Sequence, residues 1–309
     1  MPQAPLFRDP IHDGAADPTI VWNREEQAWW LLYTNRRANV ECPGLSWAHG
    51  TDIGIASSDD GGKTWIYRGI LQGLETGHGR NTYWAPEILW HDGLYHMYVS
   101  YIRGVPDTWN GLRHIMHMTS VNLWDWKRES TLNLSSERVI DACVFRLPGG
   151  MWRMWYKDEA AGSATFSADS ADLYTWGTPR KVLDDRPHEG PNVFEWRGKY
   201  WMIVDPWQGL GVYSSTDLET WTKHENILNV PGTRKDDGPI GRHADVLVQG
   251  DDAYIFYFTH PEWHTEPADW NYGARRTSLQ AARLEIENGI IVCDRDAEFD
   301  LNLQPPADC

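Results

Sequence analysis

Three carboxylic acids stand at the start of three similar apolar stretches that are far apart in the chain. Asp17 begins DPTIVW, Asp141 begins DACVF and Glu189 begins EGPNVF. If these stretches are repeats that close into a ring, the start of every repeat faces the same central axis. The three carboxyl groups would then meet in one pocket, which is an arrangement typical of a hydrolase.

A second pattern, Ser-x-Asp/Asn-Leu-x-x-Trp, recurs along the chain. Its copies begin at Ser120, Ser170 and Ser215, and a longer relative, SDDGGKTW, begins at Ser58. Short polar side chains favour turns because they bond to nearby backbone groups. A Trp after such a turn anchors the next strand. We interpret the motif as a structural turn between two strands.

Aromatic strand-turn-strand segments lie upstream of these turns. They cover residues 19–34, 84–101, 144–157, 193–205 and 244–259. The repeats start at positions 17, 84, 141, 189 and 243, which are 67, 57, 48 and 54 residues apart. A period near fifty with four short strands per unit is typical of propeller blades. We therefore predict an all-β fold, a five-bladed β-propeller of four-stranded antiparallel blades around a central axis, as one catalytic domain over residues 1–309.

Composition narrows the possible partners. The net charge of -16 argues against nucleic acid, whose phosphates would be repelled. No apolar run is long enough to cross a bilayer, so we expect no membrane partner. The chain has 19 Trp residues, more than a core of this size needs, and this excess favours contact with sugar rings in addition to packing between blades.

The cysteines and the N-terminus give weaker signals. The four cysteines form no C-x-x-C pair and are expected to be free thiols: Cys42, Cys143, Cys293 and Cys309. No basic segment followed by an apolar core opens the chain. A cytoplasmic location is the default expectation, and a secreted or periplasmic one applies if the chain is processed. The sequence leaves the oligomeric state open.

The openings of the five repeats together resemble glycoside hydrolase family 43. They read ADPTI at 16–20, WAPEI at 84–88, ID at 140–141, EGP at 189–191 and GRHADV at 241–246. The resemblance runs from about residue 17 to residue 259. Related groups with the same ring include arabinanase-like and anhydro-galactosidase-like enzymes, so the resemblance indicates polysaccharide degradation without fixing the sugar.

The resemblance implies roles for the three acids. Asp17 would act as general base, Glu189 as general acid, and Asp141 would hold Glu189 and raise its pKa. Inverting cleavage needs an acid and a base roughly 6.5–9.5 Å apart on opposite faces of the sugar, and no redox cofactor. Many family members have Pro after the middle Asp, where this chain has Ala142. Asp9 in RDP is a rival to Asp17, which we prefer because an apolar strand follows it directly.

Five further residues are predicted to contact substrate: Trp84, Glu87, Arg242, His243 and Trp263. Trp84 and Arg242 open blades and are candidates for a sugar platform and for a contact to a hydroxyl or carboxylate. In the family, the His that opens the fifth blade often lies by a central cation or water, so His243 is also a candidate for a calcium-associated site. The alternative is a buried, hydrogen-bonded His243.

Specificity is expected to reside in long loops at residues 36–50, 73–83, 103–113 and 260–276. The last loop is rich in aromatic and basic residues: His260, Trp263, His264, Trp270 and Arg275. Long loops on several blades favour a closed pocket and exo action on a plant- or algal-type oligosaccharide. The resemblance leaves arabinofuranosidase-, xylosidase- and galactosidase-like activities open.

Three other functions compete with a hydrolase. A non-catalytic sugar-binding propeller would not need the three acids. A sialidase-like enzyme is suggested by the turn at Ser58, but the chain shows no evident Arg triad or Tyr nucleophile. A glycoside phosphorylase on the same ring would replace the base with basic residues that grip phosphate, and Asp17 argues for water instead.

Overall fold

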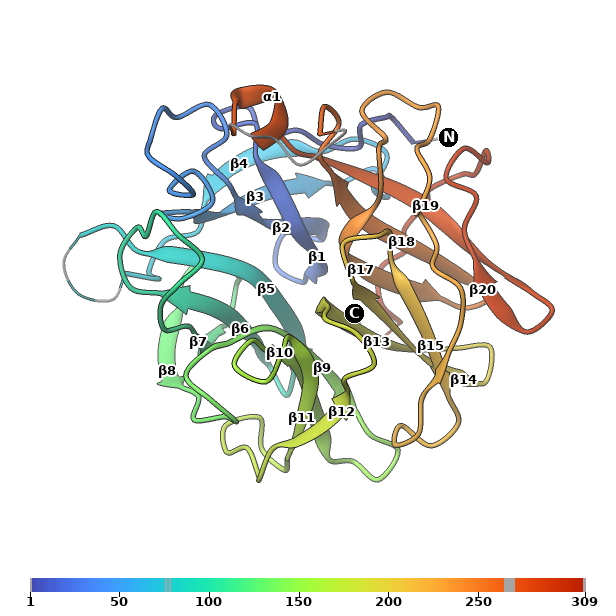
Figure 1. The fold of residues 1–309 in the computed structure, drawn as a ribbon. Helices are drawn as coiled ribbons and strands as arrows, with labels where there is room; N and C mark the ends of the chain where they lie inside the picture. Colours follow the sequence, from blue (N-terminus) through green and yellow to red (C-terminus); the bar gives the residue numbers. More distant parts are fainter. Residues whose placement is uncertain (1, 76, 78, 264–269, 308–309) are drawn as a thin grey trace.

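Five four-stranded antiparallel sheets surround a central axis in the computed structural model, which describes residues 2–75, 77, 79–263 and 270–307 (Figure 1). The predicted five-bladed propeller is confirmed. The strands, blade by blade, are β1 (Ala15–Asn23), β2 (Ala28–Asn35), β3 (Asp52–Ser58) and β4 (Ile66–Ile70); β5 (Thr82–His91), β6 (Leu94–Ile102), β7 (His114–Ser120) and β8 (Lys127–Thr131); β9 (Val139–Arg146), β10 (Trp152–Asp158), β11 (Ala164–Ser170) and β12 (Arg180–Leu183); β13 (Glu189–Trp196), β14 (Lys199–Asp205), β15 (Gly211–Ser215) and β16 (Thr222–Lys223); β17 (Arg242–Gln249), β18 (Asp252–Thr259), β19 (Ser278–Glu287) and β20 (Ile290–Val292).

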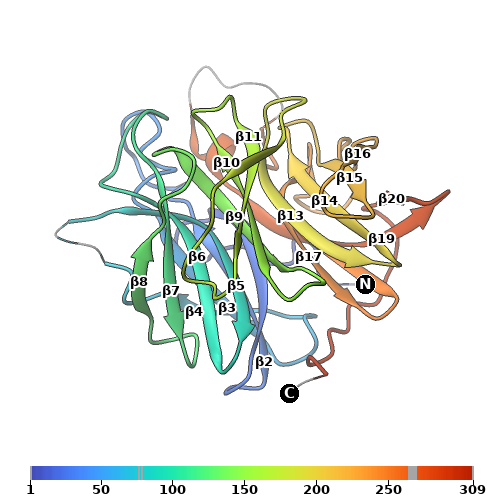
Figure 2. The same cartoon turned by 90° about the horizontal axis from the view of Figure 1, so that it is seen from below.

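The first strand of each blade lies nearest the axis, as predicted, and Figure 2 shows the same ring from the side. Strands β1, β5, β9, β13 and β17 each contact the inner strands of the neighbouring blades, and β1 beside β17 closes the ring. The N-terminal segment strengthens this closure, because Phe7 bridges to Leu279 on β19. Within the described ranges the one α-helix is α1 (Tyr272–Arg275), and no helix there could span a membrane.

Each pair of neighbouring blades encloses its own apolar cluster, since a single twisted sheet cannot bury both faces alone. Many Trp residues belong to these clusters. Trp30, Trp155 and Trp201 are fully buried between blades. Much of the Trp content is therefore structural, which leaves a smaller set available for ligand contact.

The repeated Ser-containing motif forms a turn after the third strand of a blade, as predicted. In three copies the Ser Oγ accepts a hydrogen bond of 2.9 Å from the backbone N–H of the motif Leu. These residues, Leu123, Leu173 and Leu218, are buried with φ of 67°, 66° and 63°. The side-chain hydrogen bond stabilises a left-handed conformation that leucine rarely adopts.

Every inner strand carries a bulge near its start. Pairing with the second strand slips between Ala16 and Thr19 in β1, and equivalent slips occur in the other four inner strands. Asp17 and Asp141 occupy their bulges with φ of 49° and 60°, and Gly190 has φ of 57°. A left-handed conformation at a non-glycine residue costs on the order of 1–2 kcal/mol and persists where the surroundings enforce it. The bulges thus turn side chains toward the axis at the cost of local strain.

Gly190 is required because the His243 ring occupies the space where a side chain would project. A Cβ at Gly190 would lie 2.6 Å from Cδ2 and Cγ of His243.

We expect Gly190→Ala to lower the free energy of unfolding by about 1–3 kcal/mol, as overpacking does, measured by urea denaturation. Gly198→Ala is the matched control, since Gly198 has φ of +74° and nothing within 4 Å. Equal losses in both variants would show that backbone strain, not the His243 contact, requires glycine.

A buried histidine pair in blade 2 links stability to pH. His96 Nδ1 lies 2.9 Å from His117 Nε2, and Tyr98 stacks on the His117 ring. Burial lowers the pKa of both imidazoles to about 4. Between the unfolded-state pKa near 6.5 and pH 4 the unfolded chain binds protons that the native state does not, so stability falls as pH falls through this range.

We expect the double variant His96→Gln/His117→Gln to lose less stability than the wild type between pH 6.5 and pH 4, measured by urea unfolding at each pH. His114→Gln is the control, because His114 begins β7, the strand that also carries His117. This variant should keep the wild-type pH dependence. A double variant with the wild-type slope would contradict the account.

Candidate active site

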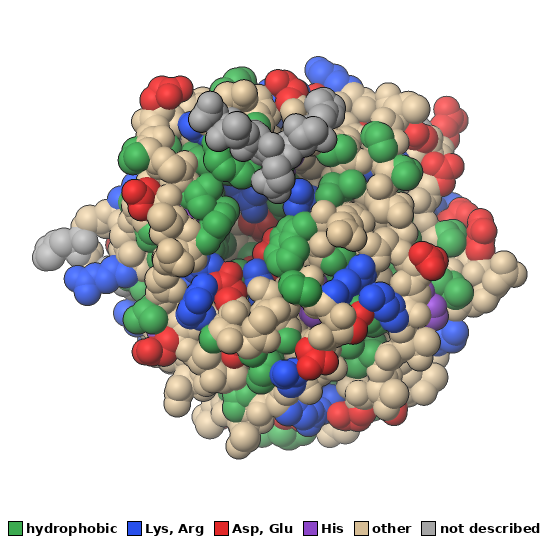
Figure 3. Space-filling model, viewed as in Figure 1, with side chains coloured by type: hydrophobic (Ala, Val, Ile, Leu, Met, Phe, Trp, Pro, Cys, Tyr) green, Lys and Arg blue, Asp and Glu red, His purple; other side chains and the backbone are tan. Residues whose placement is uncertain are grey.

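A cavity of about 330 Å³ opens at the axis on one face of the ring. Figure 3 shows this hollow near the middle of the face, with hydrophobic side chains around it and charged side chains inside. The lining residues are Asp17, Arg36, Trp47, Ala48, Trp84, Trp109, Arg113, Ile140, Asp141, Lys157, Glu159, Glu189, Trp207, Arg242, His243, Phe258, His260, Trp263 and Trp270.

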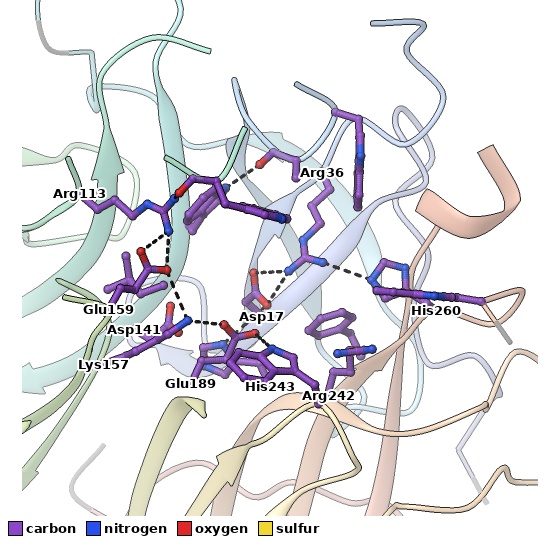
Figure 4. Close-up of a pocket in the computed structure, with 18 of the residues that line it drawn as sticks. Asp17, Arg36, Arg113, Asp141, Lys157, Glu159, Glu189, Arg242, His243 and His260 are labelled. Atoms are coloured by element: carbon purple, nitrogen blue, oxygen red, sulfur yellow. Dashed lines mark hydrogen bonds and ion pairs between the residues drawn. The ribbon is translucent and has the colours of Figure 1, made fainter. Parts of the chain in front are cut away.

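The structure brings the three sequence-predicted acids together in this cavity (Figure 4). Asp17 is the third residue of β1, Asp141 the third residue of β9 and Glu189 the first residue of β13. The backbone N–H of Gly190 donates to Asp141 Oδ2 at 3.2 Å, so the Asp141 carboxyl lies beside the start of the strand that carries Glu189. The bulges of β1 and β9 and the first residue of β13 therefore present three carboxyl groups to one space.

Asp17 is held by the guanidinium of Arg36, which in turn contacts the imidazole of His260. Arg36 Nη2 donates to Asp17 Oδ1 and Oδ2 at 3.2 and 3.3 Å. Arg36 also stacks on Phe258 and donates to His260 Nε2 at 3.4 Å. His260 Nδ1 lies 2.9 Å from the Ala274 carbonyl, to which it donates, and Nε2 is therefore free to accept. These contacts fix the Asp17 carboxylate with its oxygens toward the cavity.

Asp9, the rival to Asp17, is a structural residue. It is buried outside the cavity and accepts hydrogen bonds from the Tyr33 hydroxyl at 2.6 Å and the Asn35 amide at 3.0 Å. Its carboxylate thus fixes the end of β2 and is not available to a ligand.

Glu189 is paired with a buried lysine. Lys157 Nζ, on β10, donates to Glu189 Oε2 at 2.9 Å and lies 3.4 Å from Glu159 Oε1. The Trp207 indole N–H donates to the other oxygen, Glu189 Oε1, at 2.9 Å. The Lys157 side chain is 5% exposed, so water screens this pair little.

The protonation pattern differs from the sequence-based expectation that Asp141 raises the pKa of Glu189. Burial alone would raise the pKa of Glu189, but the Lys157 ammonium, its hydrogen bond and the Trp207 N–H hold it at about 2. Burial, opposed by His243 and reinforced by Glu189, raises the pKa of Asp141 to about 7. The pKa of Asp141 therefore lies above that of Glu189, because Lys157 stabilises Glu189 as a carboxylate.

His243 opens into the same space, where carboxylates surround its ring. Burial would lower its pKa, yet the surrounding carboxylates of Asp141, Asp17, Glu189 and Asp205 raise it. Its Nδ1 lies 3.7 Å from Asp17 Oδ1. Ca²⁺ prefers oxygen ligands, and the calcium-associated site at His243 stays a prediction. Among the residues described, no three His, Cys, Asp or Glu side chains converge as metal ligands.

The other predicted contact residues divide into two groups. Trp84, Arg242 and Trp263 line the cavity. Glu87 does not: it lines a smaller cavity further along the axis and accepts a hydrogen bond of 2.7 Å from the Val144 N–H. Burial raises the pKa of Glu87 to about 8. His264, in the predicted specificity loop, lies outside the described residues.

Two aromatic residues absent from the predicted set offer the more accessible faces. Trp109 is 49% exposed and Trp207 is 38% exposed, whereas Trp84 is 8% exposed and its indole N–H donates to the Ala48 carbonyl at 2.7 Å. Trp263 is packed against Arg242 and Trp270. Trp109 and Trp207 are thus the better candidates for stacking on a sugar ring.

The fold is similar to that of solved family-43 glycoside hydrolases. A thermostable family-43 glycoside hydrolase is 20% identical, with a TM-score of 0.70 over 97% of this chain and 98% of that one. A β-xylosidase/α-arabinofuranosidase from a compost microbial metagenome, solved in complex with xylotriose, is 15% identical, with a TM-score of 0.69 over 93% and 94%. An exo-1,5-α-L-arabinanase from a bovine ruminal metagenomic library is 17% identical, with a TM-score of 0.66 over 93% and 99%.

No protein-family model matches the chain, and no curated protein matches it in sequence. The chain has a family-43-like fold, and at these identities the likeness concerns the fold alone.

Proposed function

We propose that this protein is an inverting glycoside hydrolase that acts on an oligosaccharide, with Asp17 as general base and Glu189 as general acid. The observation that carries the proposal is the meeting of Asp17, Asp141 and Glu189 in one axial cavity with aromatic walls. The family-43-like fold supports it, because solved structures of that fold include glycosidases of several specificities.

The proposed reaction needs only water and the two acids. Asp17 takes a proton from water as the water oxygen attacks the anomeric carbon, and Glu189 gives its proton to the departing glycosidic oxygen. The new C–O bond forms on the face opposite the bond that breaks. Asp17 ends protonated and Glu189 ionised, and exchange with solvent restores both. No cofactor is required for these steps.

Asp141 and Glu189 are proposed to share the one proton that this reaction uses. Asp141, with a pKa of about 7, holds it in the free enzyme, while Lys157 keeps Glu189 ionised. Transfer to Glu189 would accompany substrate binding, when the glycosidic oxygen approaches. Because the two groups interact strongly, they titrate as a pair and not as separate sites.

Arg36 and Trp207 are proposed as positioning residues. Arg36 holds both oxygens of Asp17, and Trp207 holds one oxygen of Glu189. Orientation of the reacting groups is a large part of enzymatic rate enhancement. The cavity volume of about 330 Å³ lies at the small end of the range for ligand pockets, which favours exo action.

A panel of aryl glycosides and plant or algal oligosaccharides, in buffer with and without phosphate, tests the proposal. A hydrolase releases free sugar at a rate independent of phosphate. Release only with phosphate would indicate a phosphorylase, and binding without release would indicate a sugar-binding propeller.

A further inference from the structure

Four Lys and Arg side chains line the cavity, and three of them form ion pairs with its carboxylates. Arg36 pairs with Asp17 at 3.2 Å, Lys157 pairs with Glu189 at 2.9 Å, and Arg113 forms an ion pair with Glu159. The fourth cation is Arg242. Within the described part of the chain its guanidinium donates no hydrogen bond and forms no ion pair, although it lines the cavity.

Arg242 is held in place by packing against an aromatic ring. It is the first residue of β17, where its backbone pairs with Phe258. Its guanidinium carbon lies 4.8 Å from the centroid of the Trp263 ring. Trp263 is itself fixed by edge contacts with His260 and Trp270, whose ring centroids lie 4.9 and 4.7 Å away. Stacking uses the face of the guanidinium and leaves its N–H edge free.

The carboxylate of Asp205 does not satisfy the hydrogen-bond donors of Arg242. Asp205 interacts with Arg242 through space, but its carboxylate oxygens already accept the backbone N–H groups of Trp207 at 2.7 Å and His243 at 3.1 Å. Asp205 is fully buried and does not line the cavity. The donors of Arg242 therefore remain available to a ligand.

We propose that Arg242 binds an anionic substituent of the sugar, a carboxylate or a sulfate ester, so that the substrate is an acidic oligosaccharide. The inference rests on the proposed function only in placing a sugar in the cavity of Asp17 and Glu189. A guanidinium presents a planar fork that matches two oxygens of a carboxylate or sulfate. Neutral hydroxyls would accept its hydrogen bonds but would give it no charged partner inside the cavity.

The charge of the whole chain limits the size of this substrate. A net charge of -16 opposes the approach of a long polyanion. A short oligosaccharide, or the end of a chain that carries one acidic unit, is therefore the expected form.

Matched substrates test the inference. 4-Nitrophenyl β-D-glucuronide and β-D-xyloside share one ring and differ in the carboxylate, and 4-nitrophenyl galactoside 6-sulfate and galactoside differ in the sulfate. Uronate-containing and sulfated oligosaccharides, each with a neutral counterpart, extend the panel. We expect the wild type to prefer one kind of acidic member by about 10- to 100-fold in kcat/KM, the size of one charge-assisted contact. The substrate pair that shows this preference identifies the anionic group as a carboxylate or a sulfate ester.

Variants assign the preference to Arg242. Arg242→Gln should abolish it, and Arg242→Lys, which keeps the charge but not the fork, should restore it in part. Arg197→Gln is the matched control. Arg197 also stacks on an indole, that of Trp196, but it follows the far end of β13 from Glu189. A preference for neutral members, or an equal loss on both members in Arg242→Gln, overturns the inference.

Calorimetry with the same sugars separates this inference from the proposed function. If the wild type binds acidic sugars, Arg242→Gln does not, and no glycoside is cleaved, the inference stands and the proposed function fails. If neutral glycosides are cleaved and acidic ones are neither bound nor cleaved, the function stands and the inference fails. If nothing is bound, the inference also fails.

Discussion

Glu189→Gln and Asp17→Asn are each expected to lower kcat by about 10²–10⁴-fold, because each removes one partner of general acid-base catalysis. Both side chains line the axial cavity, and both substitutions preserve shape. Initial rates on an aryl glycoside measure the loss, and circular dichroism checks the fold. Glu195→Gln, an exposed position on the same strand as Glu189, is the control and should keep wild-type activity.

The leaving group distinguishes the two roles. A dinitrophenolate leaves without protonation, so Glu189→Gln should regain much of its activity on a 2,4-dinitrophenyl glycoside relative to a poorer leaving group. Asp17→Asn should regain none, because water must still be activated. The same pattern in both variants would contradict the assignment of acid and base.

Asp141→Asn is expected to shift the basic limb of the kcat/KM profile to lower pH. In the wild type the Asp141–Glu189 pair keeps its proton up to about pH 7, because burial raises the pKa of Asp141. Without Asp141 the remaining acid is Glu189, whose pKa Lys157 and Trp207 hold at about 2. Activity at pH 7 should fall roughly tenfold for each unit that the limb moves.

Lys157→Met should move the limb in the opposite direction. It removes the ammonium that stabilises ionised Glu189, and the pKa of Glu189 then rises. The pH profiles of the two variants and the wild type, on one substrate, provide the measurement. A basic limb unchanged in Asp141→Asn would remove Asp141 from the proton-sharing pair.

The ring and its three acids could be predicted because they depend on local, repeated signals. The Ser-containing turn fixes the third and fourth strands, and the spacing of the inner strands fixes the number of blades. Asp17, Asp141 and Glu189 follow from the ring, since equivalent strand starts face one axis. The bulges were not predicted. Glu87 lies three residues further along β5 than Trp84 and therefore lines the smaller cavity further along the axis.

Three of the cavity residues that were not predicted as site residues come from or follow the ends of second strands: Arg36, Lys157 and Trp207. Antiparallel pairing places Asn35 opposite Ala15, Asp158 opposite Val139 and Asp205 opposite Glu189. Arg36, Lys157 and Trp207 therefore lie at or near the same level as the acids. The register of each hairpin could have indicated these positions. It could not have indicated the ion pair between Lys157 and Glu189, because that contact joins two blades. The ion pair lowers the pKa of Glu189.

The anomeric configuration of the first sugar released tests the central claim most directly. ¹H NMR of a hydrolysis time course, recorded before mutarotation, resolves the two anomers. Water activated by Asp17 on the face opposite Glu189 predicts that the first product carries the inverted configuration. A first product with retained configuration would contradict the proposed roles of Asp17 and Glu189.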